Sequence, residues 1–80
     1  MEYLATFFTH SGAIKYKKHL LNLGYSVDLM PVPRKVSSNC GIAAKFNFDI
    51  DIKAIISEDI EQLYRVEGKE YKLLYKTDEG

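Results

Sequence analysis

The sequence has one cysteine, two prolines and no tryptophan, and its 11 basic residues are balanced by 11 acidic ones. A single cysteine cannot close an internal disulfide, which excludes a disulfide-stapled secreted scaffold and favours a reducing cytoplasm. A neutral chain lacks the basic excess of general nucleic-acid binders. No apolar run approaches the roughly 18 residues of a membrane span, and no leader precedes a cleavage site. We therefore expect a cytoplasmic protein with neither nucleic acid nor a membrane among its partners.

What is present fits one small globular domain covering residues 1–80. The hydrophobic fraction is 46% and the charged fraction is 28%, an ordinary globular balance. A chain of this length buries only about 60–65% of its unfolded surface. That leaves room for one core and one shallow site, and it excludes a deep cleft between two domains.

The neutral total hides an uneven distribution of charge. Up to Phe46 the sequence has six basic and two acidic residues, and after Phe46 it has five basic and nine acidic ones. Such a split is compatible with a positive and a negative end of the molecule. Ordinary solvated faces are the simpler explanation.

A strand followed by a helix is predicted in the first part of the chain. Residues 3–8, YLATFF, are aromatic and rich in strand-forming types, which indicates a buried strand. Ser11 can cap a helix with its side-chain oxygen, and Gly24 stands where a left-handed terminating residue is wanted. Apolar residues at helical spacing predict its buried stripe: Ala13, Ile14, Tyr16, Leu20, Leu21 and Leu23. Lys15, Lys18 and His19 fall on the opposite side.

Two further strands are predicted on either side of a polar connection. Residues 27–32 indicate a strand that ends at Pro31 and Pro33, because each proline removes a backbone donor. Residues 34–39 are polar and form the connection. The next segment, 41–48, alternates strictly, which predicts a half-buried strand. One face of that strand carries Ile42, Ala44, Phe46 and Phe48.

The last part of the chain predicts a second helix and a hairpin. Asp49 or Asp51 can cap the helix, whose stripe contains Ile52, Ile55, Ile56, Ile60 and Leu63. Residues 63–66 and 70–75 predict two strands that turn at 67–69.

This order of elements predicts an α+β fold of the ferredoxin-like, split βαβ type. The expected arrangement is βαββαβ with an extra C-terminal strand, in which two helices cover one face of an antiparallel sheet. A different pairing of the second and third strands stays open. In the split βαβ unit the first and second strands are parallel, so their C-terminal ends lie at the same edge of the sheet.

That topology brings several chemically active residues together. The turn after the first strand contains His10, and it should approach the connection that contains Arg34, Lys35 and Cys40. The positive end of a helix dipole and a nearby guanidinium both favour a thiolate over a thiol. Lys35 and His10 would act in the same direction. Cys40 is therefore either a reactive thiol or an inert one, and the residue types alone do not distinguish the two.

Most enzyme classes and an RNA platform are disfavoured. A metal site needs three or four clustered ligands, and one cysteine with two distant histidines supplies no such cluster. The sequence has no phosphate-binding glycine loop and no arginine in a short loop after Cys40. The strand at 41–48 places Phe46 and Phe48 on the face that we expect the helices to cover, which leaves a poor stacking platform for bases. We therefore expect no metal, no cofactor and no catalytic activity.

The stretch at residues 31–41, PVPRKVSSNCG, resembles the selenium/sulfur carrier protein-like family of small bacterial domains. The resemblance rests on the Pro-x-Pro-Arg element ending at Arg34, the serines Ser37 and Ser38, and the Cys40-Gly41 pair that opens an apolar strand. It covers roughly residues 2–75.

The resemblance implies that Cys40 carries sulfur or selenium as a persulfide or selenosulfide. A donor such as a cysteine desulfurase would load it, and an acceptor protein would unload it. Arg34 would stabilise the anion, and Ser37 or Ser38 would donate hydrogen bonds or hold the loop. A thiolate is the attacking species in such exchanges, which agrees with these residue types.

Two other classes of function stay open. One is a small anion-binding or regulatory module, in which Arg34 and the helix N-terminus hold a ligand and Cys40 is incidental. That function predicts ligand-dependent stabilisation that survives Cys40→Ala. The other is an interaction module that forms a homodimer through the open face of its sheet.

Overall fold

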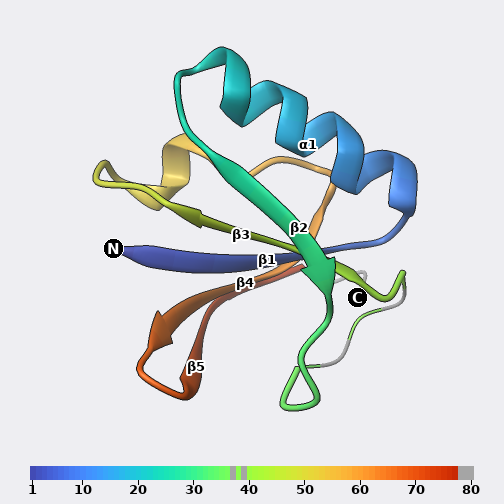
Figure 1. The fold of residues 1–80 in the computed structure, drawn as a ribbon, viewed down its shortest axis with the longest axis vertical. Coiled ribbons are helices and arrows are strands. Elements are labelled where there is room, and N and C mark those ends of the chain that lie inside the picture. Colours follow the sequence, from blue (N-terminus) through green and yellow to red (C-terminus); the bar gives the residue numbers. More distant parts are fainter. Residues whose placement is uncertain (37, 39, 78–80) are drawn as a thin grey trace.

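The computed structural model describes residues 1–36, 38 and 40–77, and its chain path is drawn in Figure 1. A helix lies between the first two strands, and the chain ends in a hairpin of two strands. The elements are β1 (Glu2–Phe7), α1 (His10–Asn22), β2 (Val27–Pro31), β3 (Ile42–Asn47), the short 3-10 helix η1 (Ile52–Ala54), β4 (Ile60–Glu67) and β5 (Glu70–Lys76).

The strands form one sheet in the order β2-β3-β1-β4-β5, and all neighbouring strands are antiparallel. Because β3 pairs with both β1 and β2, the latter two strands run in the same direction, with their C-terminal ends at one edge of the sheet. The predicted α+β class and antiparallel sheet are confirmed. The hairpin between β4 and β5 is also confirmed, and its turn is opened by Gly68 with a positive φ of 63°.

The prediction of two helices on one face is wrong, because α1 is the only helix longer than one turn in the described part of the chain. Asp51 does cap a helix, accepting from the backbone N–H of Lys53 at 3.0 Å, but this is η1, which has three residues. Ile60 and Leu63 of the predicted stripe lie instead in β4, where strands pair on both sides. A strand inside a sheet pairs its backbone N–H and C=O groups with neighbours on both sides, and this pairing outweighs the helical spacing that Ile60 and Leu63 also fit.

Helix α1 begins earlier than predicted and buries a narrower stripe. Its N-cap is Thr9, not Ser11, and the Thr9 side chain accepts from the backbone N–H of Gly12 at 3.0 Å. Ala13, Tyr16 and Leu20 are buried as expected. The flanking residues Ile14, Leu21 and Leu23 are exposed, contrary to the prediction. A single helix on a sheet covers only the side chains that point at the strands, so the residues at the borders of a wide stripe stay in solvent.

The main core lies between α1 and one face of the sheet. Alternate residues of β1, Tyr3, Ala5 and Phe7, point into it, and Tyr16 meets the rings of Phe7 and Phe46 at centroid distances of 5.3 and 5.9 Å. Phe46 and Phe48 are both buried in this core, so neither is available to stack on a base.

The opposite face of the sheet has a smaller apolar cluster of its own. Leu4 and Ala43 are fully buried there although no helix covers them. Val36, from the connection between β2 and β3, is buried against both. The connection therefore runs beneath the sheet and covers part of the face that the sequence leaves open for a homodimer. The homodimer itself stays a prediction.

Tyr16 holds the irregular segment that takes the place of the second helix. Its buried hydroxyl donates to the backbone carbonyl of Ile55 at 2.8 Å. Burial raises the pKa of Tyr16 far above its ordinary value of 10. The phenol therefore stays neutral in the folded protein at pH values where the unfolded chain ionises.

Tyr16→Phe is expected to lower the free energy of unfolding by about 1–2 kcal/mol at neutral pH, because the Ile55 carbonyl loses its partner. A raised folded pKa stabilises the fold below the unfolded pKa, and that contribution is lost as the pH rises above it. The wild type should lose up to about 1.4 kcal/mol per pH unit above about pH 10 through this one group. Urea unfolding from about pH 8 to about pH 11 measures both effects.

The variant should show a shallower alkaline loss than the wild type. Tyr75→Phe is the matched control, because Tyr75 is a half-buried tyrosine of β5 that packs on the same core. Parallel pH profiles for the wild type and Tyr16→Phe would contradict the assignment.

Candidate thiol site

Cys40 lies at the end of the β2–β3 connection, two residues before β3 begins. It is a free cysteine, half-buried, with its side chain packed against the edge of the main core. Gly41, which follows it, has a φ of 76°, and the chain bends into β3 there through a conformation that other residues rarely adopt. Apart from its two chain neighbours, no described residue has an atom within 4 Å of where a Cβ at Gly41 would stand, so the need for glycine there comes from the backbone conformation.

Two polar groups of the described residues lie near the sulfur. As a thiol, Cys40 Sγ donates to the backbone carbonyl of Ile42 at 3.4 Å. The hydroxyl oxygen of Ser38 is 3.9 Å from the same sulfur. A thiolate has no proton to donate, so ionisation breaks the bond to Ile42 and makes a nearby hydroxyl donor valuable.

Ser38 ties the connection to the end of β1. Its hydroxyl donates to the Phe7 carbonyl at 3.2 Å and accepts from the Cys40 backbone N–H at 3.4 Å. One side chain therefore fixes the amide of Cys40 and stands next to its sulfur.

His10 fixes the other side of the same residue. Its Nε2 lies 2.7 Å from the Cys40 carbonyl oxygen. A carbonyl can only accept, so Nε2 carries the proton and donates. Because His10 is the first residue of α1, this bond joins the Cys40 peptide to the start of the helix. The topology thus brings together the two segments that the sequence analysis expected to meet.

Lys35, which the prediction grouped around the thiol, has its partners elsewhere, and the position of Arg34 next to the thiol stays a prediction. Lys35 Nζ donates to the Lys69 carbonyl at 3.1 Å and pairs with Glu70 at 3.4 Å, which directs its charge to the β4–β5 turn. Arg34 is exposed, and it forms no hydrogen bond or ion pair with any residue that the structure describes. Ser37, the remaining candidate, lies outside the described residues.

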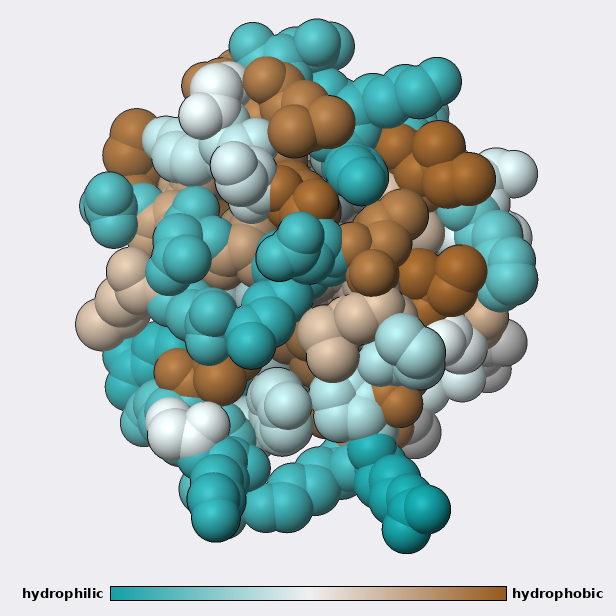
Figure 2. All heavy atoms as spheres, viewed as in Figure 1, coloured by the Kyte–Doolittle hydropathy of each residue, from teal (hydrophilic) through white to brown (hydrophobic). Residues whose placement is uncertain are grey.

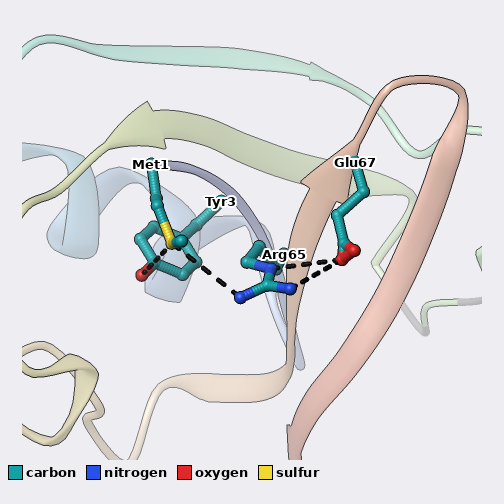
Figure 3. A network of polar contacts seen from close by, with 4 residues as sticks. All are labelled: Met1, Tyr3, Arg65 and Glu67. Carbon is teal, nitrogen blue, oxygen red and sulfur yellow. Dashed lines mark hydrogen bonds and ion pairs between the residues drawn. The ribbon is translucent and has the colours of Figure 1, made fainter.

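The second arginine of the chain is engaged elsewhere, in the network of Figure 3. Arg65 on β4 holds the Glu67 carboxylate through Nη2 at 2.8 Å and Nε at 3.3 Å. Its Nη1 also donates to the sulfur of Met1, which accepts from the Tyr3 hydroxyl as well. The bonds and charge of Arg65 hold the pKa of Glu67 below its ordinary value. Because Arg65 pairs with Tyr3 near the start of β1, this network lies far along the sheet from Cys40.

A shallow, apolar surface hollow lies along the edge strand β2. Its volume is about 290 Å³ and it is lined by Leu29, Met30, Pro31, Gly41 and Ile42, the last two of which follow Cys40 in the sequence. Among residues 1–36, 38 and 40–77 there is no group of three His, Cys, Asp or Glu side chains able to hold a metal ion. Nor does any helix in that part of the chain have the length and apolar character needed to cross a membrane.

Two members of the site could not be found from residue types. The carbonyls of Phe7 and Ile42 contact Ser38 and Cys40, and a backbone carbonyl has the same chemistry at every position. The site therefore combines one half-buried thiol, the Ser38 hydroxyl beside it, and a Cys40 backbone that is hydrogen-bonded at both its N–H and its C=O. It can support attack by sulfur on a partner that reaches the thiol.

One comparison with known proteins gives a match. A family model described as "Putative Se/S carrier protein-like" matches residues 2–76, a range that includes all five strands, α1 and the Cys40 connection. No curated protein and no solved structure matches the chain.

Proposed function

The chain belongs to this Se/S carrier-like family, and from that membership we propose that it carries sulfur or selenium on Cys40. The carried atom is held as a persulfide or a selenosulfide. The protein receives it from a donor of the cysteine desulfurase type and passes it to an acceptor protein. It is a carrier, and the chemistry that generates the cargo belongs to its partners.

The observation that carries this proposal is the placement of the single thiol. Cys40 is the only cysteine in the chain, so it is the only side chain able to form a persulfide. It is half-buried at the molecular rim, with no disulfide partner. A carrier needs this combination, because the thiol must meet two partners in turn and must keep its cargo from bulk reductants between them.

The loading step is a thiol exchange at sulfur. The Cys40 thiolate attacks the terminal sulfur of a donor hydropersulfide, R–S–SH. A bond forms between Cys40 Sγ and that terminal sulfur, the donor's S–S bond breaks, and the donor leaves as the thiolate R–S⁻ with the bonding electron pair. The product is Cys40–S–SH, and no external oxidant or reductant is consumed. Unloading is the same exchange with an acceptor thiolate as the attacking group.

The neighbouring groups have separate roles in this step. Loss of the thiol proton breaks the bond from Sγ to the Ile42 carbonyl. The Ser38 hydroxyl, 3.9 Å away, then turns its one proton from the Phe7 carbonyl to the anion. His10 keeps the Cys40 peptide in place through its bond to the carbonyl. Arg34 is exposed, and its proposed role is to pair with an anionic cargo through its guanidinium.

Loading of the wild-type protein with glutathione hydropersulfide tests this function. Intact-mass analysis after removal of the reagent should show a gain of one sulfur atom, reversed by dithiothreitol. Protein alkylated beforehand with iodoacetamide is the control, and it should gain nothing. A folded protein that is readily alkylated but takes up no sulfur would overturn the carrier function, and a thiol that also resists alkylation would remove any role based on sulfur.

A further inference from the structure

The outer side of α1 carries an exposed stripe that begins at the thiol site. Ile14 and Leu21, predicted to be buried, are 49% and 48% exposed. They share one helical face with His10, Lys17 and Lys18, because these positions recur at intervals of three, four and seven residues. Figure 2 shows apolar groups set among hydrophilic ones over this helix.

The stripe has charge of one sign. The sequence of α1, HSGAIKYKKHLLN, contains three lysines and two histidines and no acidic residue. Lys18 is exposed and Lys17 is half-buried, and both lie between the two aliphatic side chains, which are seven residues, or about 10 Å, apart along the helix. Lys15 lies to one side, and among the described residues it is the only lysine of α1 paired with a carboxylate, at 3.9 Å from Asp59. The basic charge of the stripe is therefore uncompensated by its own helix.

The position of the stripe relates it to the cargo. His10, at its N-terminal end, donates to the Cys40 carbonyl at 2.7 Å. A partner protein bound along the outer face of α1 would therefore reach Cys40 at the N-terminal end of the helix. A surface with this location suits a protein that exchanges an atom with Cys40.

We propose that the stripe formed by His10, Ile14, Lys17, Lys18 and Leu21 docks the protein that donates sulfur to Cys40, through an acidic surface with an apolar centre. This rests on the proposed carrier function. Exposed lysines steer an acidic partner and set its association rate, and the two aliphatic side chains supply the apolar contact. A lipid surface fits less well, because interfacial helices bury a broad apolar face with aromatic anchors and this stripe has only two half-exposed aliphatic residues.

The test compares a protein donor with a small one. Sulfur transfer to Cys40 is timed from a persulfide-loaded cysteine desulfurase and, separately, from glutathione hydropersulfide. For the double variant Lys17→Glu/Lys18→Glu we expect transfer from the desulfurase to slow at least about 10-fold at low salt. Transfer from the small donor should stay within about 2-fold of wild type, because neither lysine contacts Cys40 in the described contacts. Ile14→Ser/Leu21→Ser should also slow transfer from the desulfurase and leave transfer from the small donor unchanged. Because this variant keeps both lysines, the size of its defect relative to the wild type should not depend on salt.

The matched control is Lys53→Glu/Lys76→Glu, which changes the net charge equally at two exposed lysines outside α1. It should load like the wild type from both donors. If the α1 variants accept sulfur from the desulfurase at the wild-type rate, the docking proposal is wrong and the carrier function stands. The same holds if the wild type loads only from the small donor. If neither donor loads the wild type, the carrier function fails first. Two other results would also overturn the proposal if the same residues had no effect on transfer. One is that these residues bind phosphatidylglycerol vesicles, and the other is that they cause salt-sensitive self-association.

Discussion

Cys40→Ser is expected to abolish uptake of sulfane sulfur while leaving the fold intact. A serine hydroxyl cannot form a persulfide, and the chain has no second cysteine to replace the lost thiol. The hydroxyl can still donate to the Ile42 carbonyl, as the thiol does at 3.4 Å. We therefore expect the free energy of unfolding to change by less than about 1.5 kcal/mol. The measurement pairs intact mass after hydropersulfide treatment with urea unfolding.

The two readouts must separate for the assignment to stand. A variant that unfolds with the wild type and gains no sulfur places the cargo on Cys40. A serine variant that still gains one dithiothreitol-sensitive sulfur would show that the atom is held elsewhere in the molecule. A variant that loses both stability and uptake is resolved by Cys40→Ala, which removes the polar atom from the edge of the apolar core.

Phe7→Ala should have the largest effect on stability, a loss of about 3–5 kcal/mol in the free energy of unfolding. Phe7 is fully buried at the end of β1, with its ring against Tyr16. A protein of 80 residues has a total stability of about 4–12 kcal/mol, so this single truncation removes a large part of it. Urea unfolding followed by far-UV circular dichroism gives the change from the shift of the midpoint.

Its neighbour provides the control. Phe8 is also an aromatic residue but is only half-buried and lies outside both apolar clusters. Phe8→Ala should therefore cost less than half as much as Phe7→Ala. Equal losses at the two positions would contradict the position of the core that the alternation in β1 defines.

The strands could be predicted because their patterns are local. The alternation in β3 and the glycine turn between β4 and β5 depend on residues within a few positions of one another. The prediction of a second helix was wrong for the opposite reason. Ile60 and Leu63 fit a helical period as well as a strand, and only pairing with β1, more than 50 residues away in sequence, selects the strand.

The site was predictable in its location and not in its contacts. The split βαβ order was enough to bring His10 near Cys40, since it fixes which ends of the strands share an edge. It could not show that the imidazole contacts the carbonyl of Cys40. Lys35 was expected to face the thiol, but its partners, Lys69 and Glu70, lie more than 30 residues further along the chain. The roles of these residues in sulfur transfer stay predictions.

Under the proposed carrier function, the anchoring of Cys40 limits how a sulfur atom can be delivered. Carriers that present their cargo on a long swinging arm can visit several catalytic centres from one docked position. Here the residue is fastened to α1 through its carbonyl and to the end of β1 through Ser38. One rotatable bond, Cα–Cβ, separates the sulfur from this backbone, and an added sulfur atom extends its reach by one S–S bond, about 2 Å. In the proposed exchange, each partner would therefore have to bring its own reacting group to Cys40, on a loop or protruding segment.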